Sequence, residues 1–297
     1  MEKWNRKWFI IDIINSIIFP LPKFPLPFRE GEYIINYYFL KMANYYKSEF
    51  YKYPIEVENI EWEVIVTITD TNWRKVIYSW YDLISKNSES FYITKCLLWW
   101  FIKKTPKNVL IIGFWWWAFW KYLEDHIKDI KVTGIDIDKS MFKIAKNELN
   151  IKTNDFMIMD WNIAIKKLIS EEKKYDLILI DVYWSNWKIP KSFQDKKIYE
   201  NIKKLTLKEW IISINYSNYH SFNQEKYDKI HENIIKIFWK NFIHLMPWKT
   251  DRWNVAWIYN LDKNYKSEEI SLKYLEKVKK WEILYDSNMI KNIIIEK

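Results

Sequence analysis

Residues 108–123 read NVLIIGFWWWAFWKYL, and this stretch decides the fold. The apolar run Val109–Ile112 predicts a buried strand that ends in Gly113, and a helix is expected over 118–127. This order of strand, glycine and helix is typical of nucleotide-binding loops: glycine permits the tight turn, and the helix N-terminus offers free N–H groups to an anion. The turn where a ligand would have to approach the backbone is occupied by three consecutive indoles, Trp115, Trp116 and Trp117.

The glycine and tryptophan contents of the chain are both unusual. Its 297 residues include 3 Gly and 20 Trp, whereas ordinary proteins contain about 7% Gly. Together the two residue types make up about 8% of the chain, an ordinary glycine content. Some bacterial lineages read UGA as glycine, while a common alternative translation table renders it as tryptophan. We therefore hypothesise that many Trp residues are mistranslated Gly; the alternative is a genuinely Trp-rich protein.

The hypothesis changes what the central loop can do. With glycine at 115, 116, 117 and 120, the stretch 113–120 becomes GFGGGAFG, and positions 113, 115 and 118 fit G-x-G-x-x-G/A. Gly113, Trp115, Trp116 and Trp117 are then candidates for binding a nucleotide. On the Trp-rich alternative, the same stretch is an apolar core turn lined by indoles.

From 108 to about 260, strands and helices alternate. The strand-like runs are Val109–Ile112, Val132–Ile135, Phe156–Met159, Leu177–Ile180 and Ile211–Ile214. The helical stretches are 118–127, 139–149, 162–170, 194–204 and 223–238. This order predicts an α/β fold with a doubly wound, mostly parallel, Rossmann-like sheet. Two further runs without a long helix between them, Phe242–Met246 and Val255–Tyr259, predict an antiparallel pair at one edge.

The flanking regions predict an N-terminal β-hairpin extension and a short C-terminal part. Glu63–Thr69 and Lys75–Tyr78 alternate as strands do, and glycine at Trp73 would give an Asn-Gly turn between them. We expect a helix from Ser90 to about Lys103 and, in the tail, a helix over 267–280 and an apolar run over 290–295. The expected parts are the extension 1–104, the nucleotide-binding domain 105–262 and the tail 263–297.

Three acidic residues follow three of the predicted strands. Asp136 lies about 20 residues beyond the glycine loop, where a carboxylate accepts ribose hydroxyls. Asp160, followed by Trp161, is placed to meet an adenine amino group, and Asp181 to act as a base or to orient a substrate amine. The alternatives are structural: a surface acid for Asp136, the N-cap of helix 162–170 for Asp160, and a strand-end cap for Asp181. Asp138 is the expected N-cap of the helix after Asp136.

The stretch 60–260 resembles the spermidine synthase family of polyamine aminopropyltransferases and its relatives on the class I methyltransferase fold. The family's glycine loop resembles 113–120, and its ribose-binding acid, its adenine aspartate–glycine pair and its catalytic-loop aspartate fall on Asp136, Asp160–Trp161 and Asp181. Further matches are Ile189-Pro190, the helix through Tyr199, Leu207–Trp210, the strand-ending Tyr78-Ser79-Trp80, and Glu89 with Tyr92.

The resemblance implies a transferase that binds S-adenosylmethionine or its decarboxylated form. It implies Asp181 and Tyr183 as catalytic residues, Glu89 and Tyr92 as substrate residues, and a small-molecule amine as acceptor. Aminopropyltransferases usually carry a second aspartate three residues after the catalytic-loop aspartate, and this position is Trp184 here. A glutamine and a histidine of the family fall on Leu83 and Ile93. The absence of these three side chains argues against polyamine binding but not against adenosine binding. The alternative reaction is methyl transfer to an unknown small acceptor. The third candidate enzyme is a dinucleotide dehydrogenase. The candidate that is not an enzyme is a non-catalytic nucleotide-binding relative.

Composition argues against several other classes. The net charge of +9 comes almost wholly from Lys, whereas base and phosphate readout favours Arg, so we expect no nucleic-acid partner. The run Phe9–Phe19 is too short and too polar to span a membrane. Cys96 is the only cysteine and the four His show no ligand spacing, so no metal site is expected. We expect a cytoplasmic protein, with a homodimer as the assembly considered.

Overall fold

The chain divides into the units 1–40 and 41–297, and the computed structural model describes part of the second. The described residues are 41–69, 73, 75–84, 86, 105–113, 117–152, 155–182, 189–217, 224–238, 242–245, 254–259, 265–266, 269–270, 272–273 and 275–276. The predicted helix over 90–103 and the run over 290–295 lie outside them. Of the predicted tail helix, the residues described between 269 and 276 are helical.

A seven-stranded sheet forms the centre of the second unit, in the order β10-β11-β9-β8-β5-β6-β7. Its strands are β5 (Asn108–Ile112), β6 (Lys131–Asp136), β7 (Phe156–Ile158), β8 (Tyr175–Ile180), β9 (Thr206–Ser217), β10 (Phe242–Leu245) and β11 (Asn254–Tyr259). The five strands from β9 to β7 are parallel, while β10 and β11 are antiparallel to each other and β11 to β9. The predicted doubly wound sheet with an antiparallel edge is confirmed.

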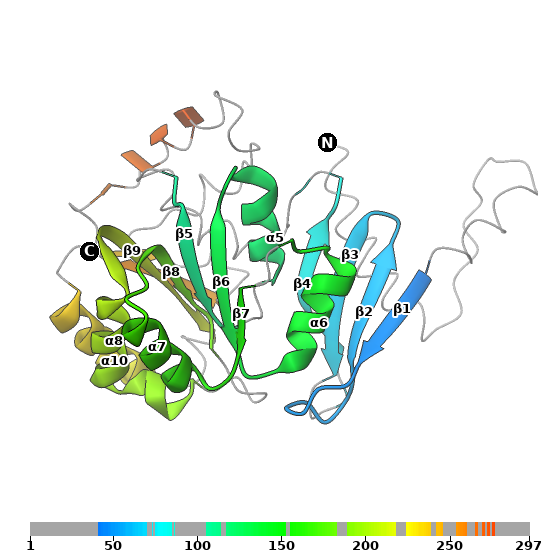
Figure 1. Cartoon of the computed structure of the whole chain (residues 1–297), viewed down its shortest axis with the longest axis horizontal. Coiled ribbons are helices and arrows are strands. Elements are labelled where there is room, and N and C mark those ends of the chain that lie inside the picture. The colour runs from blue at the N-terminus through cyan, green and yellow to red at the C-terminus, as the bar shows by residue number, and fades with distance from the viewer. Residues whose placement is uncertain are drawn as a thin grey trace, which may run out of the picture. The chain divides into compact units, whose positions relative to one another are not determined.

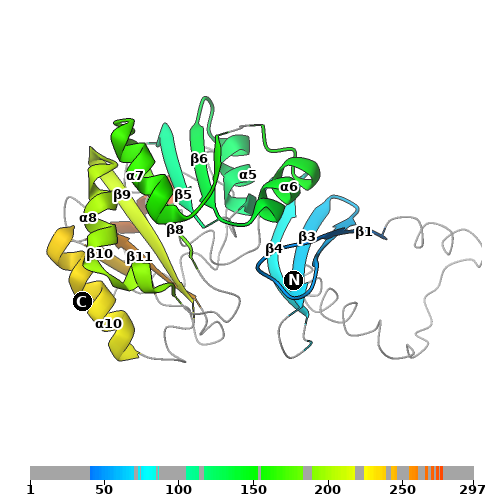
Figure 2. The ribbon, with the colours of Figure 1, turned by 60° about the horizontal axis from the view of Figure 1, so that its bottom comes forward.

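Helices cover both faces of this sheet (Figures 1 and 2). They are α5 (Trp117–His126), α6 (Lys139–Glu148), α7 (Trp161–Ser170), α8 (Lys196–Lys204) and α10 (Gln224–Ile237), with a 3-10 turn η2 (Lys191–Gln194) before α8. In β5, Val109 and Ile111 pack with α5 and α6, whereas Leu110 and Ile112 pack with α7, α8 and α10. The strand is apolar throughout because each face meets its own helical layer. None of the described helices is long and apolar enough to cross a membrane.

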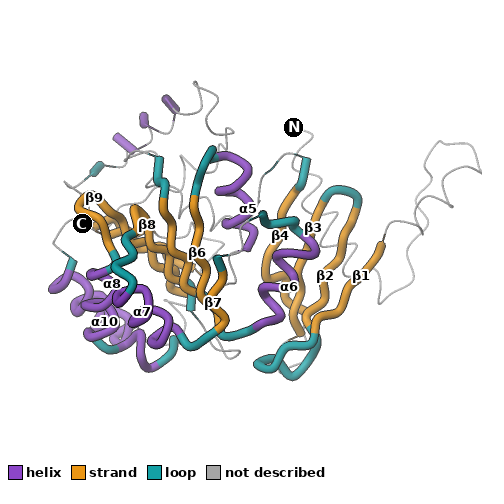
Figure 3. Tube along the Cα trace, viewed as in Figure 1, coloured by secondary structure: helices purple, strands orange, loops and turns teal. Residues whose placement is uncertain are grey.

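A separate four-stranded antiparallel sheet precedes the central one (Figure 3). It contains β1 (Lys41–Tyr46), β2 (Ile55–Ile60), β3 (Glu63–Thr69) and β4 (Lys75–Asp82). The predicted hairpin is β3 and β4, and β1 and β2 are additional. Side chains of β2, β3 and β4 belong to the same core cluster as α5 and α6, so this small sheet is packed onto the helices that cover the central sheet.

Six described residues other than glycine adopt a left-handed backbone: Glu61, Trp73, Lys86, Asp129, Asn150 and Glu172. The last three follow the C-terminal ends of α5, α6 and α7, where glycine is the usual residue. Trp73 has φ +62° and its side chain is 73% exposed, so it gains little from burial in return for a conformation that glycine adopts without strain.

Candidate functional site

Four of the predicted site residues lie at the carboxyl edge of the parallel strands. Asp181 follows β8, Gly113 follows β5, Asp136 ends β6, and Asp160 comes two residues after β7. The strands that carry them are neighbours in the order β8-β5-β6-β7, and at about 4.8 Å between strands the row spans roughly 14 Å. Because β6 and β8 flank β5 on opposite sides, the row includes the topological switch point at which open α/β sheets bind ligands.

Gly113 is the residue on which this edge depends. Its amide donates to the Ile135 carbonyl at 2.9 Å, and the Asp181 amide donates to the Ile112 carbonyl at 2.8 Å, so three strand ends are joined. Gly113 has φ +88°, and a Cβ atom there would lie 1.9 Å from the Asp181 carbonyl oxygen. Only glycine fits, and the close approach brings the first residue of the loop directly against the candidate catalytic aspartate.

Asp181 is buried with a partner that the sequence did not reveal. Asp181 is only 4% exposed, and its Oδ1 accepts a hydrogen bond of 2.8 Å from Nδ2 of Asn215. Asn215 lies on β9, the strand next to β8, and is itself 6% exposed. A buried carboxylate needs such donors. Asn215 stands 34 residues away along the chain and carries no motif.

Asp136 and Asp138 form a connected pair at the start of α6. The Asp138 amide donates to Oδ1 of Asp136 at 2.7 Å, which orients the Asp136 carboxylate. Asp138 caps the helix by accepting from the Ser140 amide at 2.8 Å, as the sequence predicted. Asp138 Oδ2 also accepts from the hydroxyl of Ser48, which lies after β1.

Asp160 and Trp161 open α7, the helix after β7. Asp160 is its N-cap, since Oδ1 accepts from the Asn162 amide at 2.8 Å, which is the structural role weighed from the sequence; a contact to a nucleobase stays a prediction. The Trp161 indole is buried, donates to Ser192 Oγ at 2.8 Å and packs edge-on against Phe193.

Two of the unusual tryptophans lie at the start of α5. Trp117 and Trp120 are both fully buried. Trp120 donates to Glu124 Oε1 at 3.0 Å and stacks on Phe156. The indole N–H of Trp117 is buried and has no hydrogen-bond partner among the described residues, and a buried unsatisfied donor costs about 1–3 kcal/mol.

Several predicted site residues lie outside the described residues: Glu89, Tyr92, Trp115, Trp116, Tyr183 and Trp184. Others are placed differently from their expected positions. Trp80 lies inside β4, two residues before its end, and Trp210 lies inside β9, which begins at Thr206, rather than in a turn. Tyr199 is a core residue whose hydroxyl donates to the Phe193 carbonyl at 2.7 Å.

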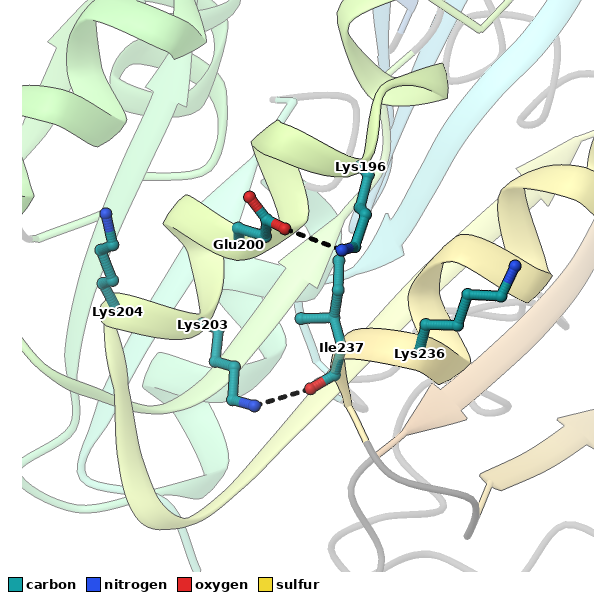
Figure 4. Close-up of a pocket in the computed structure, with 6 residues that line it drawn as sticks. All are labelled: Lys196, Glu200, Lys203, Lys204, Lys236 and Ile237. Carbon is teal, nitrogen blue, oxygen red and sulfur yellow. Dashed lines mark hydrogen bonds and ion pairs between the residues drawn. The ribbon is translucent and has the colours of Figure 1, made fainter.

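A pocket of about 460 Å³ lies elsewhere, between α8 and α10 (Figure 4). It is lined by Lys196, Glu200, Lys203, Lys204, Lys236 and Ile237. Lys196 is paired with Glu200 at 3.1 Å, and Lys203 donates to the Ile237 carbonyl at 2.7 Å, so these cations already have protein partners. The pocket contains none of the predicted site residues. Among the residues described, no three His, Cys, Asp or Glu side chains cluster as metal ligands do.

Comparison with known proteins finds similarity in structure alone. No family model matches the sequence, and no curated protein does. A probable spermidine synthase from Corynebacterium glutamicum superposes with a TM-score of 0.63 at 14% identity, covering 79% of this chain and 87% of that one. The Thermotoga maritima spermidine synthase gives 0.53 at 14%, covering 92% and 94%.

Two further solved structures were determined with ligands. A spermidine synthase in complex with the transition state analogue AdoDATO gives a TM-score of 0.54 at 13% identity, covering 93% of this chain and 96% of that one. Human methyltransferase-like protein 13 in complex with SAH gives 0.51 at 15%, covering 66% and 92%. At these identities the likeness establishes the fold: the chain has the methyltransferase-like α/β fold with an added antiparallel sheet.

Proposed function

We propose that the protein is a transferase that binds S-adenosylmethionine or its decarboxylated form, and that it transfers an aminopropyl group to a polyamine-type amine. The observation that carries this proposal is the row of Asp181, Gly113 and Asp136 across the switch point of the sheet. The names of the fold's solved neighbours support it, since two were determined with adenosyl ligands.

The residues present fit an adenosyl ligand. Asp136 is held by the Asp138 amide at the position where a carboxylate accepts ribose hydroxyls, and Gly113 lets the backbone of Asp181 pack directly against the first residue of the loop. Asp160 would meet the adenine. When bound, the ligand supplies a sulfonium that activates the adjacent carbon, so the protein's task is mainly to position the acceptor.

Asp181 would hold the acceptor amine and take up its proton. Its burial and its hydrogen bond from Asn215 fix the carboxylate, which a group that orients a nucleophile requires. Tyr183 is the expected nearby hydroxyl, and Glu89 and Tyr92 are the expected contacts to the acceptor.

Methyl transfer to a small acceptor is the second candidate. The observation that favours it is in the sequence: Trp184 occupies the position where aminopropyltransferases usually carry a second aspartate in the catalytic loop. The four-stranded sheet before the nucleotide-binding fold favours the first candidate, because the resemblance places such an extension in that family.

We also propose that tryptophans of the central loop, and Trp73 between β3 and β4, are glycines in the native protein. The buried unsatisfied N–H of Trp117 and the left-handed backbone of the exposed Trp73 support this. At Trp120 and Trp161 the indoles have hydrogen-bond acceptors, so geometry does not separate the two interpretations there. The codons at 115–117 test the proposal: UGG in place of UGA overturns it.

The function is tested by calorimetry on the protein translated with glycine at UGA codons. Intact and decarboxylated S-adenosylmethionine are titrated with and without putrescine, and product is measured. We expect tighter binding of the decarboxylated form and loss of turnover in Asp181→Asn, with Asp195→Asn, an exposed helix cap on α8, as the control. Preference for the intact form would favour methyl transfer. Tight binding without turnover in the wild type would make the chain a non-catalytic nucleotide-binding protein.

A further inference from the structure

The four-stranded sheet and the connection between β1 and β2 contact the two ends of α6, the helix that follows Asp136. At the C-terminal end, Glu148 accepts hydrogen bonds from Asn44 on β1 at 2.9 Å and from Asn59 on β2 at 2.8 Å, and from the Tyr46 hydroxyl. At the N-terminal end, Ser48 donates to Asp138. The helix is therefore held along its length by a part of the chain about 90 residues earlier.

The N-terminal contact is buried and charged. Ser48 is 7% exposed and Asp138 is 5% exposed, and the Ser48 hydroxyl lies 2.5 Å from Asp138 Oδ2. Asp138 Oδ1 accepts from both the amide and the hydroxyl of Ser140, at 2.8 and 2.7 Å. The hydroxyl of Ser48 thus supplies the donor to the second carboxylate oxygen, and hydrogen bonds to ionised groups are the stronger ones.

Asp138 passes this restraint to Asp136. Its amide donates to Asp136 Oδ1 at 2.7 Å, so the orientation of the Asp136 carboxylate depends on where the Asp138 backbone lies. The other end of the loop is fixed as well, because the Asp136 carbonyl accepts from the Met159 amide at 3.0 Å. Ser48, Asp138 and Asp136 form one continuous chain of contacts.

We infer that Ser48 is a positioning residue for the ribose site: acting through Asp138, it fixes the carboxylate of Asp136 that receives the ribose hydroxyls. The inference rests on the proposed function, since it assumes an adenosyl ligand at Asp136. It assigns the small sheet a role in binding the cofactor in addition to its packing role, and it makes the selectivity for a hydroxylated ribose a property of a residue outside the nucleotide-binding fold.

The first test compares two ligands by calorimetry: S-adenosylhomocysteine and its 2′,3′-dideoxy analogue, which lacks both ribose hydroxyls. The wild type is expected to prefer the parent compound by about tenfold or more, the effect of a charge-assisted hydrogen bond. Ser48→Ala should reduce that preference several-fold, and Ser48→Thr, which keeps the hydroxyl, should restore it. Ser170→Ala removes an exposed hydroxyl bonded to the Lys167 carbonyl in α7 and should leave the preference unchanged.

The second test needs no ligand. Amide hydrogen exchange of the free protein should be faster at Asp138 in Ser48→Ala than in the wild type. The amides of Phe50 and Tyr51 will also exchange faster, because both donate to Ser48 Oγ, so Asp138 is the deciding position. If Ser48→Ala does not fold, Ser48→Cys, with its weaker donor, takes its place.

The outcomes separate this inference from the proposed function. A wild type that binds neither ligand overturns both. A wild type that prefers the parent compound, with the same preference and the same Asp138 exchange in Ser48→Ala, overturns the role of Ser48 and leaves the proposed function standing. An equal loss of affinity for both ligands in Ser48→Ala also overturns it, because the effect would then not act through the ribose hydroxyls.

Discussion

Asn215 shows how much one hydrogen bond at the site should contribute. Asn215→Leu keeps the number and branching of the side-chain heavy atoms but removes the donor to the buried Asp181 carboxylate, so we expect the free energy of unfolding to fall by about 1–3 kcal/mol. The fall is measured by urea denaturation, with Asn201→Leu on the surface of α8 as the control. Turnover should fall as well, while affinity for the cofactor changes little. Equal unfolding free energies for the two variants would contradict the prediction.

Gly113 allows a prediction of larger size. Gly113→Ala places a methyl group 1.9 Å from the Asp181 carbonyl oxygen and forces φ +88° on a residue with a Cβ. We expect a loss of at least about 3 kcal/mol in the free energy of unfolding, seen as a lower denaturant midpoint or as failure to fold. Ala118→Gly, five residues further along the same loop and helix, is the comparison, and it should cost roughly 1 kcal/mol from helix propensity. A Gly113→Ala protein of unchanged stability would contradict the prediction, because it would show that Gly113 and the Asp181 carbonyl are further apart than in this structure.

The candidate site could be predicted only where it depends on strand order. Asp136 and Asp181 were found because parallel strands end at a common edge, so any acid that follows such a strand joins the row. Asn215 and Ser48 were missed because their partners are 34 and 90 residues away. A single Asn inside a strand or a single Ser after one gives no local signal of a distant carboxylate.

At the scale of elements, the end of α5 carries a pH-sensitive group. His126 Nδ1 donates to the Tyr122 carbonyl at 2.9 Å, and the imidazole stacks on the Tyr122 ring with centroids 4.0 Å apart. Burial lowers the pKa of His126 below its usual value, so the folded protein favours the neutral ring. Its contribution to stability is therefore present above about pH 6.5, the ordinary pKa of histidine, and is lost as the pH falls through the lowered value.

This predicts that the free energy of unfolding decreases below about pH 6.5 by more in the wild type than in His126→Gln. Chemical denaturation at a series of pH values measures both, and His231→Gln on α10 serves as the matched control. Parallel pH profiles for the wild type and His126→Gln would contradict the assignment.

The elements of the central fold could be predicted because each has a clear hydrophobic pattern. β5 from Val109 and β8 from Leu177 are continuous apolar runs, since both faces of the sheet are covered, and the helices between them are amphipathic. β1 was missed because its sequence KMANYY does not alternate and leaves Tyr45 66% exposed. β2 was missed because a charged residue, Glu56, is buried in it next to apolar ones, where Lys75 contacts it at 2.5 Å.

At the scale of the whole molecule, the scarcity of glycine can be compared with where the backbone needs it. The turns after α5, α6 and α7 reach left-handed conformations with Asp129, Asn150 and Glu172, residue types other than tryptophan. Trp73 is the one tryptophan among the six left-handed non-glycine residues described. Local backbone conformation alone therefore supports recoding at one position, and the burial of a donor without a partner supports it at Trp117.

Trp73 and Trp120 should respond to glycine with changes of stability of opposite sign. Trp73→Gly removes a left-handed residue that costs roughly 1–2 kcal/mol, so thermal unfolding of this variant should occur at a higher temperature than in the protein with tryptophan throughout. Trp120→Gly should lower stability by about 3–5 kcal/mol if position 120 is a UGG tryptophan, because its buried ring stacks on Phe156 and its N–H has a partner.

The residues at 115, 116 and 117 should decide whether the protein can bind an adenosyl ligand. With glycine at 115, 116 and 117, we expect the turn after Gly113 to present backbone N–H groups to an adenosyl ligand. With tryptophan at these positions, we expect the side chains to block that approach, and the indole N–H of Trp117 is a buried donor without a partner among the described residues. We therefore expect S-adenosylhomocysteine to raise the unfolding temperature of the glycine form and to leave that of the tryptophan form unchanged. Peptide masses of the native protein identify the form that is made. Ligand stabilisation of the tryptophan form alone would show that the indoles belong to the site.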